Sequence, residues 1–242
     1  MTRWIRRLGG ELPGAPRLIV APHAGAGALS YRPYGLALAG RAEVWALTPP
    51  GREARLGEPP LREWAPWLAE ASAAIAAISQ DRPYVLWGHS LGALASAQLA
   101  ARHAPSHLVV SGCKPPSALR WDDPDGLDDA ALMARLRALG GTPPEVLASE
   151  ELMAMILPTL RADFKLAATY VSPPARAFAG PLTAFASLDD PAAPHALAGG
   201  WAEVAAGPFT LALFPGGHFF PFEGPRDVAP AVLAALEQVL GV

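Results

Sequence analysis

Residues 84–95 read Tyr-Val-Leu-Trp-Gly-His-Ser-Leu-Gly-Ala-Leu-Ala. The stretch begins as an apolar run, passes through the pattern G-x-S-x-G and continues with the alanine-rich composition of a helix. This order predicts a strand, a sharp turn and a helix, with the hydroxyl of Ser90 presented at the end of the strand. Gly88 and Gly92 leave the space that the backbone needs as it folds back on itself. The pentapeptide is weak evidence alone in a chain with 23 glycines, so the surrounding sequence has to support it.

The composition of the 242 residues excludes several classes of protein. With 51% apolar and 17% charged residues, the chain is not disordered, and a net charge of −3 provides no basic surface for nucleic acid or an anionic membrane. The single cysteine, Cys113, cannot form an internal disulfide, and cysteine and histidine are too sparse for a zinc site. We find neither a signal-peptide core nor an apolar stretch of about twenty residues. We therefore expect a soluble, cytoplasmic protein without a metal or a membrane partner.

Short apolar runs alternate with helical patterns along most of the chain. This alternation predicts a doubly wound, mostly parallel sheet flanked by helices, folded as one domain over residues 1–242. Helical spacing is clear at residues 64–78 and 228–240, and a further helix is expected around 201–205. The predicted strands cover residues 17–21, 43–47, 84–88, 107–112, 182–186 and 209–214.

The alternation stops between about residues 114 and 174, where two or three helical segments replace it. The plainer interpretation is a helical excursion with its own core. Its place between the strand beside the serine and the strand that brings an acidic residue favours a lid over the site. Methionines in this region would suit an adaptable apolar surface. The apolar faces that we expect to be buried are Leu132, Leu136 and Leu139 on one segment, and Leu152, Met155, Ile156 and Leu160 on another.

A serine hydroxyl needs a neighbouring base and a third group that orients the base before it can act as a nucleophile. Ser90, Asp190 and His218 each follow a predicted strand of the same parallel sheet, so we expect them along one edge. Serine, acid, histidine is also the chain order of hydrolases with this kind of turn. The alternatives are that Ser90 only caps the following helix and that His218 is an ordinary loop histidine.

The acid is less well determined by the sequence than the other two residues. Asp189 and Asp190 are adjacent, and only one of them can point at His218. We favour Asp190 because it stands just before Pro191 at the turn out of the strand. Glu223, which follows His218 closely, is a weaker alternative.

A tetrahedral intermediate also needs two donors for its oxyanion. The backbone N–H of Leu91, the residue after the serine, is one candidate. The other should come from the glycine-rich loop at residues 22–27, with Ala24 favoured over Gly25, although glycines there could be ordinary turn residues. This loop has neither G-x-G-x-x-G nor a P-loop lysine, so we do not expect a nucleotide site.

Nearly the whole chain resembles a type II thioesterase, the free-standing editing hydrolase of polyketide synthases and nonribosomal peptide synthetases. P-G-R-E, G-G-T-P and R-A-D-F are more specific for this family than the serine turn. The chain departs from the family pattern in having Leu91 where methionine is frequent and Ala-Ser-Leu at 186–188 where Gly-Gly-Asp is frequent. The matching stretches lie at residues 22–25, 49–56, 88–92, 139–144, 160–164 and 214–220.

The resemblance implies an α/β-hydrolase fold with a helical lid over an acyl channel. On the matching positions it makes Ser90 the nucleophile, His218 the base and Asp190 the orienting acid. The implied substrates are acyl or aminoacyl thioesters on the phosphopantetheine arm of acyl or peptidyl carrier proteins, so no resident cofactor is implied. A carboxylesterase or lipase-like hydrolase of small free esters and a non-catalytic hydrolase-fold interaction module are the alternative interpretations.

Overall fold

The computed structural model describes residues 3–79, 82–120 and 123–240. Within these residues, seven strands form one sheet in the order β1-β3-β2-β4-β5-β6-β7. Strand β1 is antiparallel to β3, and the other neighbouring strands are parallel. The strands are β1 (Ile5–Arg7), β2 (Arg17–Ala21), β3 (Glu43–Leu47), β4 (Tyr84–His89), β5 (His107–Ser111), β6 (Leu182–Ser187) and β7 (Phe209–Phe214).

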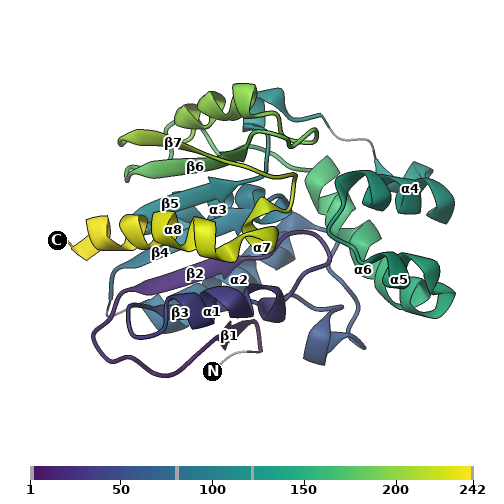
Figure 1. Ribbon diagram of the computed structural model, residues 1–242, viewed down its shortest axis with the longest axis horizontal. Helices are drawn as coiled ribbons and strands as arrows, with labels where there is room; N and C mark the ends of the chain where they lie inside the picture. Colours follow the sequence, from purple (N-terminus) through teal and green to yellow (C-terminus); the bar gives the residue numbers. More distant parts are fainter. Residues whose placement is uncertain (1–2, 80–81, 121–122, 241–242) are drawn as a thin grey trace.

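Helices cover both faces of this sheet (Figure 1). Helices α1 (Arg32–Ala37) and α8 (Pro225–Leu240) lie on one face, and α2 (Trp64–Ser79) and α3 (Leu91–His103) lie on the other. Each face has its own apolar core, because side chains of β2, β4 and β5 alternate between the two layers. The arrangement is the predicted α/β-hydrolase fold, with a mostly parallel sheet between helical layers. Among the described residues, no helix combines the length and apolarity that a bilayer crossing requires.

The structure adds elements near the N-terminus that the sequence analysis did not predict. Strand β1 has only three residues, two of them arginines, so it gives no apolar run, yet Ile5 is buried and pairs with Leu47 of β3. The 3₁₀ turn η1 (Ala28–Tyr31) and the short helix α1 were also missed. Of the helix expected at 201–205, residues 201–203 are helical, as the end of a longer 3₁₀ segment, η5 (His195–Glu203), whose Gly199 and Gly200 disfavour an α-helix.

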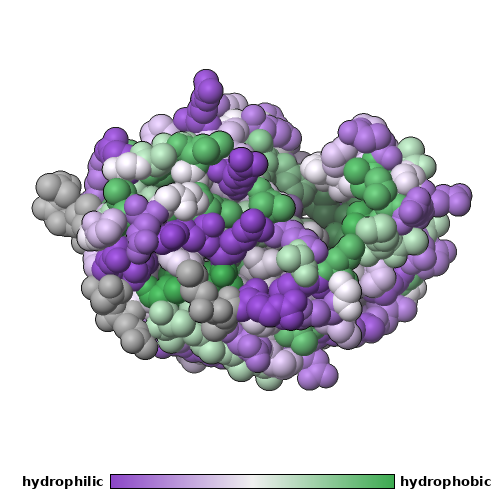
Figure 2. All heavy atoms as spheres, turned by 90° about the horizontal axis from the view of Figure 1, so that it is seen from below, coloured by the Kyte–Doolittle hydropathy of each residue, from purple (hydrophilic) through white to green (hydrophobic). Residues whose placement is uncertain are grey.

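A helical region lies between β5 and β6 and stands beyond the carboxyl ends of the parallel strands (Figure 1). Figure 2, with the molecule seen from below, shows a hollow between this region and the rest of the protein, with apolar residues around it. The elements of the region are the 3₁₀ turns η3 (Pro116–Ala118) and η4 (Pro124–Gly126) and the helices α4 (Asp129–Leu139), α5 (Pro144–Ala148) and α6 (Glu150–Ala168).

The helical region has a separate apolar core, to which α4 contributes Leu132 and Leu136 as predicted. The prediction for α6 was partly wrong, because Leu152 and Met155 are 41% and 44% exposed. The buried side chains of α6 recur at helical spacing on a different face of the helix from Leu152 and Met155, so these two side chains project outward. That face consists of Met153, Leu157, Leu160 and Phe164.

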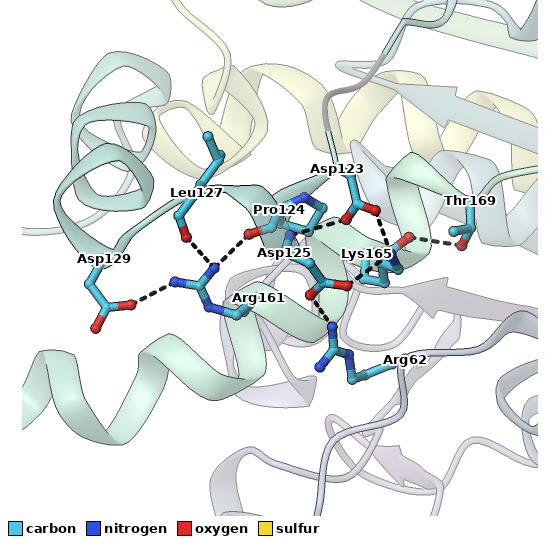
Figure 3. Close-up of polar contacts among 9 residues, drawn as sticks. All are labelled: Arg62, Asp123, Pro124, Asp125, Leu127, Asp129, Arg161, Lys165 and Thr169. Carbon is cyan, nitrogen blue, oxygen red and sulfur yellow. Dashed lines mark hydrogen bonds and ion pairs between the residues drawn. The ribbon is translucent and has the colours of Figure 1, made fainter.

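Polar contacts also join η4 and the start of α4 to α6 (Figure 3). Arg161 of α6 donates to the carbonyl oxygens of Pro124 (2.6 Å) and Leu127 (2.7 Å) and to Asp129 Oδ1 (2.6 Å). One turn later, the ammonium of Lys165 lies 2.6 Å from a carboxylate oxygen of Asp123 and 2.9 Å from one of Asp125, which also pairs with Arg62. The segment that leads into α4 is therefore attached to α6 by two cations, one helical turn apart.

His107, the first residue of β5, should make folding stability depend on pH. It is 2% exposed, its Nε2 lies 2.8 Å from Thr183 Oγ1, and burial lowers its pKa from 6.5 to about 4. Between these values the unfolded chain binds the proton more tightly than the folded one, so stability falls as pH drops from about 6.5 to 4. The expected loss from this residue between pH 7 and pH 5 is about 2 kcal/mol.

The measurement is urea unfolding of the native chain and of His107→Gln at both pH values. The other buried histidines are common to both proteins, so His107→Gln should lose about 2 kcal/mol less than the native chain. Equal losses in the two proteins would contradict this assignment.

Candidate active site

The serine turn has the geometry that the opening stretch predicts. Ser90 joins β4 to α3 with φ of 54° and ψ of −118°, a strained conformation for a residue with a side chain. A Cβ atom on Gly88 would lie 1.9 Å from the carbonyl oxygen of Gly92, and a Cβ on Gly92 would lie 2.0 Å from that of Ala21. Both positions therefore need glycine, which confirms the steric reason given for the pattern.

Ser90, His218 and Asp190 form a continuous chain of contacts at the carboxyl ends of β4, β7 and β6. His218 Nε2 lies 3.2 Å from Ser90 Oγ, and His218 Nδ1 lies 2.8 Å from Asp190 Oδ2. A carboxylate beside Nδ1 holds the imidazole proton there, which leaves Nε2 to accept the proton of the serine hydroxyl. The structure thus brings together the three residues that the sequence selected, in a geometry suited to nucleophilic attack.

The environment of Asp190 explains why it, rather than its neighbour, lies beside His218. Asp190 is 4% exposed, and its Oδ1 accepts the N–H groups of Ala192 (2.8 Å) and Ala193 (3.1 Å). Burial acts to raise the pKa of this carboxyl, but the hydrogen bond and charge of His218 and the two N–H donors outweigh it and hold the pKa below its usual value. Asp189 and Glu223 are both exposed.

His89 lies beside His218, and His23 lies beside His89; sequence analysis gave neither of these histidines a role. The ring centroids of His89 and His218 are 5.2 Å apart, and those of His23 and His89 are 5.9 Å apart. Burial lowers the pKa of His23 to about 4 and that of His89 well below its usual value. Both rings are therefore neutral at pH 7, so neither repels the positive charge that His218 gains when it accepts the serine proton.

One candidate oxyanion donor directly follows Ser90, and the other belongs to a separate loop much earlier in the chain. Leu91 begins α3 directly after the serine, and the loop at residues 22–27 follows β2, the neighbour of β4 in the sheet. The N–H of Gly25 donates to Asp163 Oδ2 at 2.7 Å. Because that donor is engaged, the N–H of Ala24 is the better candidate within the loop, and its role stays a prediction.

A cavity of about 210 Å³ opens beside Ser90 and His218. Leu139 and Arg135 of α4 line it, with Arg135 placed over the ring of Phe164 at 5.2 Å. Sequence reasoning missed the cations of this cavity because they are scattered along the chain and belong to no motif. The remaining described residues that line the cavity are Gly112, Cys113, Lys114, Leu119, Arg120, Ala192 and Ala193.

Comparison with known proteins gives the family. A family model described as a thioesterase domain matches residues 16–239. A probable cadicidin biosynthesis thioesterase of Streptomyces griseus is 37% identical over 223 residues, which are 90% of this chain and 62% of that protein. The thioesterase PikA5 of Streptomyces venezuelae is 35% identical over 223 residues, covering 90% of this chain and 79% of that one.

A solved structure agrees with these sequence matches. The type II thioesterase BorB from the borrelidin biosynthetic cluster superposes with a TM-score of 0.84 at 36% identity, over 96% of this chain and 97% of that one. The similarity therefore extends through the sheet, the flanking helices and the helical region. The chain belongs to the thioesterase family, and the resemblance to type II thioesterases that its motifs indicated is confirmed.

Proposed function

We propose that this thioesterase removes acyl or aminoacyl groups from the phosphopantetheine arm of acyl or peptidyl carrier proteins through an ester on Ser90. The chain of contacts from Ser90 through His218 to Asp190, at 3.2 and 2.8 Å, supports the chemistry. Relatives named for cadicidin and borrelidin biosynthesis support the kind of pathway. The reaction frees carriers that bear stalled or aberrant groups.

The geometry suits a two-step hydrolysis. Ser90 Oγ attacks the thioester carbonyl while His218 Nε2 takes the hydroxyl proton, and the N–H groups of Leu91 and Ala24 receive the negative oxygen. The C–S bond then breaks and His218 returns the proton to sulfur. A thiol of pKa about 8.5 leaves more readily than an alcohol, so this step needs little assistance. Water next attacks the ester carbonyl while His218 Nε2 takes one of its protons. The ester C–O bond then breaks, His218 returns the proton to Ser90 Oγ, and the free acid leaves.

The cavity beside Ser90 supports a carrier-bound substrate. Lys114, Arg120 and Arg135 line it together with apolar side chains. An acyl chain on a phosphopantetheine arm combines an apolar group with an anionic phosphodiester, and a mixed apolar and cationic lining suits both. In this proposal, the helical region at 114–174 is the lid over the acyl channel, and its α4 forms part of the channel wall. The proposed reaction uses no resident cofactor or metal, and we propose that the enzyme meets its carrier proteins in the cytoplasm.

Intact mass measurement of acylated carrier proteins tests this function. The chain should remove short acyl groups from a carrier, with kcat/KM at least about 100-fold higher than for a p-nitrophenyl ester of the same acid, since the ester lacks the arm. Equal or faster turnover of the free ester would instead indicate a carboxylesterase. A fluorophosphonate probe should label Ser90, and failure to label it would indicate a non-catalytic interaction module.

A further inference from the structure

Two motif residues that the mechanism above does not use form a buried ion pair. Arg52 belongs to the P-G-R-E stretch and Asp163 to the R-A-D-F stretch of α6, and their side chains meet in two contacts: Nη1 to Oδ2 at 2.8 Å and Nη2 to Oδ1 at 3.0 Å. The two residues are 5% and 1% exposed. Burying two charges is unfavourable unless geometry and further hydrogen bonds compensate, so their other contacts indicate what the pair does.

Those contacts lead to the loop at residues 22–27. The N–H of Gly25 donates to Asp163 Oδ2 at 2.7 Å, and Arg52 Nη1 donates to the carbonyl oxygen of Ala26 at 3.1 Å. Helix α6 also packs closely here, since a Cβ on Gly25 would lie 2.8 Å from Leu160 Cδ2. The pair therefore fastens this loop to α6 through one N–H group and one carbonyl group.

The fastened peptide group directly follows the candidate oxyanion donor. Its N–H belongs to Gly25 and bonds to Asp163, while its carbonyl oxygen belongs to Ala24 and lies 3.0 Å from His23 Nδ1. A carbonyl oxygen can only accept, so His23 Nδ1 carries the proton and donates it to that oxygen. With both polar ends of the peptide held, its plane cannot rotate freely, and the backbone at Ala24 keeps one orientation.

We propose that Asp163, with Arg52 as its partner, is a positioning residue for the oxyanion hole. Asp163 touches no reacting atom and acts by holding the Gly25 N–H, which fixes the direction of the Ala24 N–H toward the thioester oxygen. A misplacement of about 1 Å at such a site lowers the rate by about 100-fold. This inference rests on the proposed roles of Ser90 and Ala24.

The test removes both charges together, because a single substitution would leave an unpaired buried charge and endanger folding. The variant is Arg52→Met with Asp163→Leu. Its matched control is Arg17→Met with Glu43→Leu. These two residues form another buried ion pair (3.1 Å) at the amino-terminal ends of β2 and β3, whereas the active site lies at the carboxyl ends of the strands. Asp163→Glu is a second variant, which keeps the charge beside Arg52 but displaces the acceptor of the Gly25 N–H.

One substrate and one ligand separate positioning from simple destabilisation. Hydrolysis of an acyl N-acetylcysteamine thioester gives kcat and KM without a carrier protein. An alkyl boronic acid, which forms a tetrahedral adduct on the serine, measures binding in the oxyanion hole. Active-site titration with a fluorophosphonate corrects both for the folded fraction. The Arg52/Asp163 double variant should lose about 100-fold in kcat and in boronate affinity, with KM changed less than about 3-fold.

The proposal is overturned if kcat per titrated site and boronate affinity stay within about 3-fold of the native protein in the double variant, or in Asp163→Glu where the double variant does not fold. Equal losses in the Arg17/Glu43 control would overturn it as well. Ser90→Ala separates the two proposals: near-native hydrolysis by Ser90→Ala would refute the proposed function, whereas a Ser90→Ala variant slowed by about 10⁴-fold or more beside a fully active pair variant would refute the positioning role alone.

Discussion

Replacing Ser90 with alanine is expected to lower kcat by about 10⁴- to 10⁶-fold, and adding His218→Ala is expected to lower it little further. The reason is the contact of 3.2 Å between His218 Nε2 and Ser90 Oγ. In the first step His218 acts by accepting the proton of the Ser90 hydroxyl. Once that hydroxyl is absent, His218 no longer raises the rate, so its removal lowers kcat little further. The small residual rate comes from binding and from the oxyanion donors.

The measurement is single-turnover hydrolysis of an acylated carrier protein by the native chain, both single variants and the double variant. Thermal unfolding of each protein serves as the control, because His218 is buried and its replacement also changes packing. If the losses in the two single variants multiplied in the double variant, Ser90 and His218 would be acting independently, and the proposed mechanism would be wrong.

Asp190→Asn is expected to lower kcat by about 10⁴-fold while the fold remains intact. Asp190 Oδ1 accepts the N–H groups of Ala192 and Ala193, so the oxygen of the new amide takes that side. The amide nitrogen must then face His218 Nδ1 and donate to it. Nδ1 becomes an acceptor, the ring proton moves to Nε2, and His218 can no longer accept the proton of Ser90.

Asp189→Asn is the matched control, since the same change is made one residue earlier on an exposed side chain. It should leave kcat within about 2-fold of the native value, because it lies outside the chain of contacts. Both variants are compared by kcat on an acylated carrier and by melting temperature. A large loss in Asp189→Asn with none in Asp190→Asn would reverse the choice between the two acids.

The sequence was most informative where local pattern and tertiary structure agree. Strands β2, β3 and β7 have the bounds that their apolar runs predict. For β2 and β3, which are buried along their whole length, the reason is that a parallel strand inside a sheet needs apolar residues on both faces. The same reasoning placed Ser90, Asp190 and His218 at one sheet edge, because residues that follow parallel strands emerge together. The turn at Pro191 pointed to Asp190 rather than Asp189, and the structure places Asp190 beside His218.

Contacts between segments that lie far apart in the chain produce no local sequence pattern from which they could be predicted. Arg52 and Asp163 are 111 residues apart, and nothing in either motif says that they meet. The cations of the cavity, Lys114, Arg120 and Arg135, come from separate segments for the same reason. Strand β1 was missed because an antiparallel edge strand of three residues is held by its neighbour rather than by its own composition.

The attachment of α6 has a consequence for redesigning which acids the enzyme releases. Its Arg161 and Lys165 hold the segment leading into α4, and its Asp163 holds the loop beside the nucleophile. Substitutions along α6 would therefore disturb turnover together with selectivity. Leu139 of α4 lines the cavity but takes part in neither of these attachments. The preference for acyl-chain length is therefore better engineered from α4.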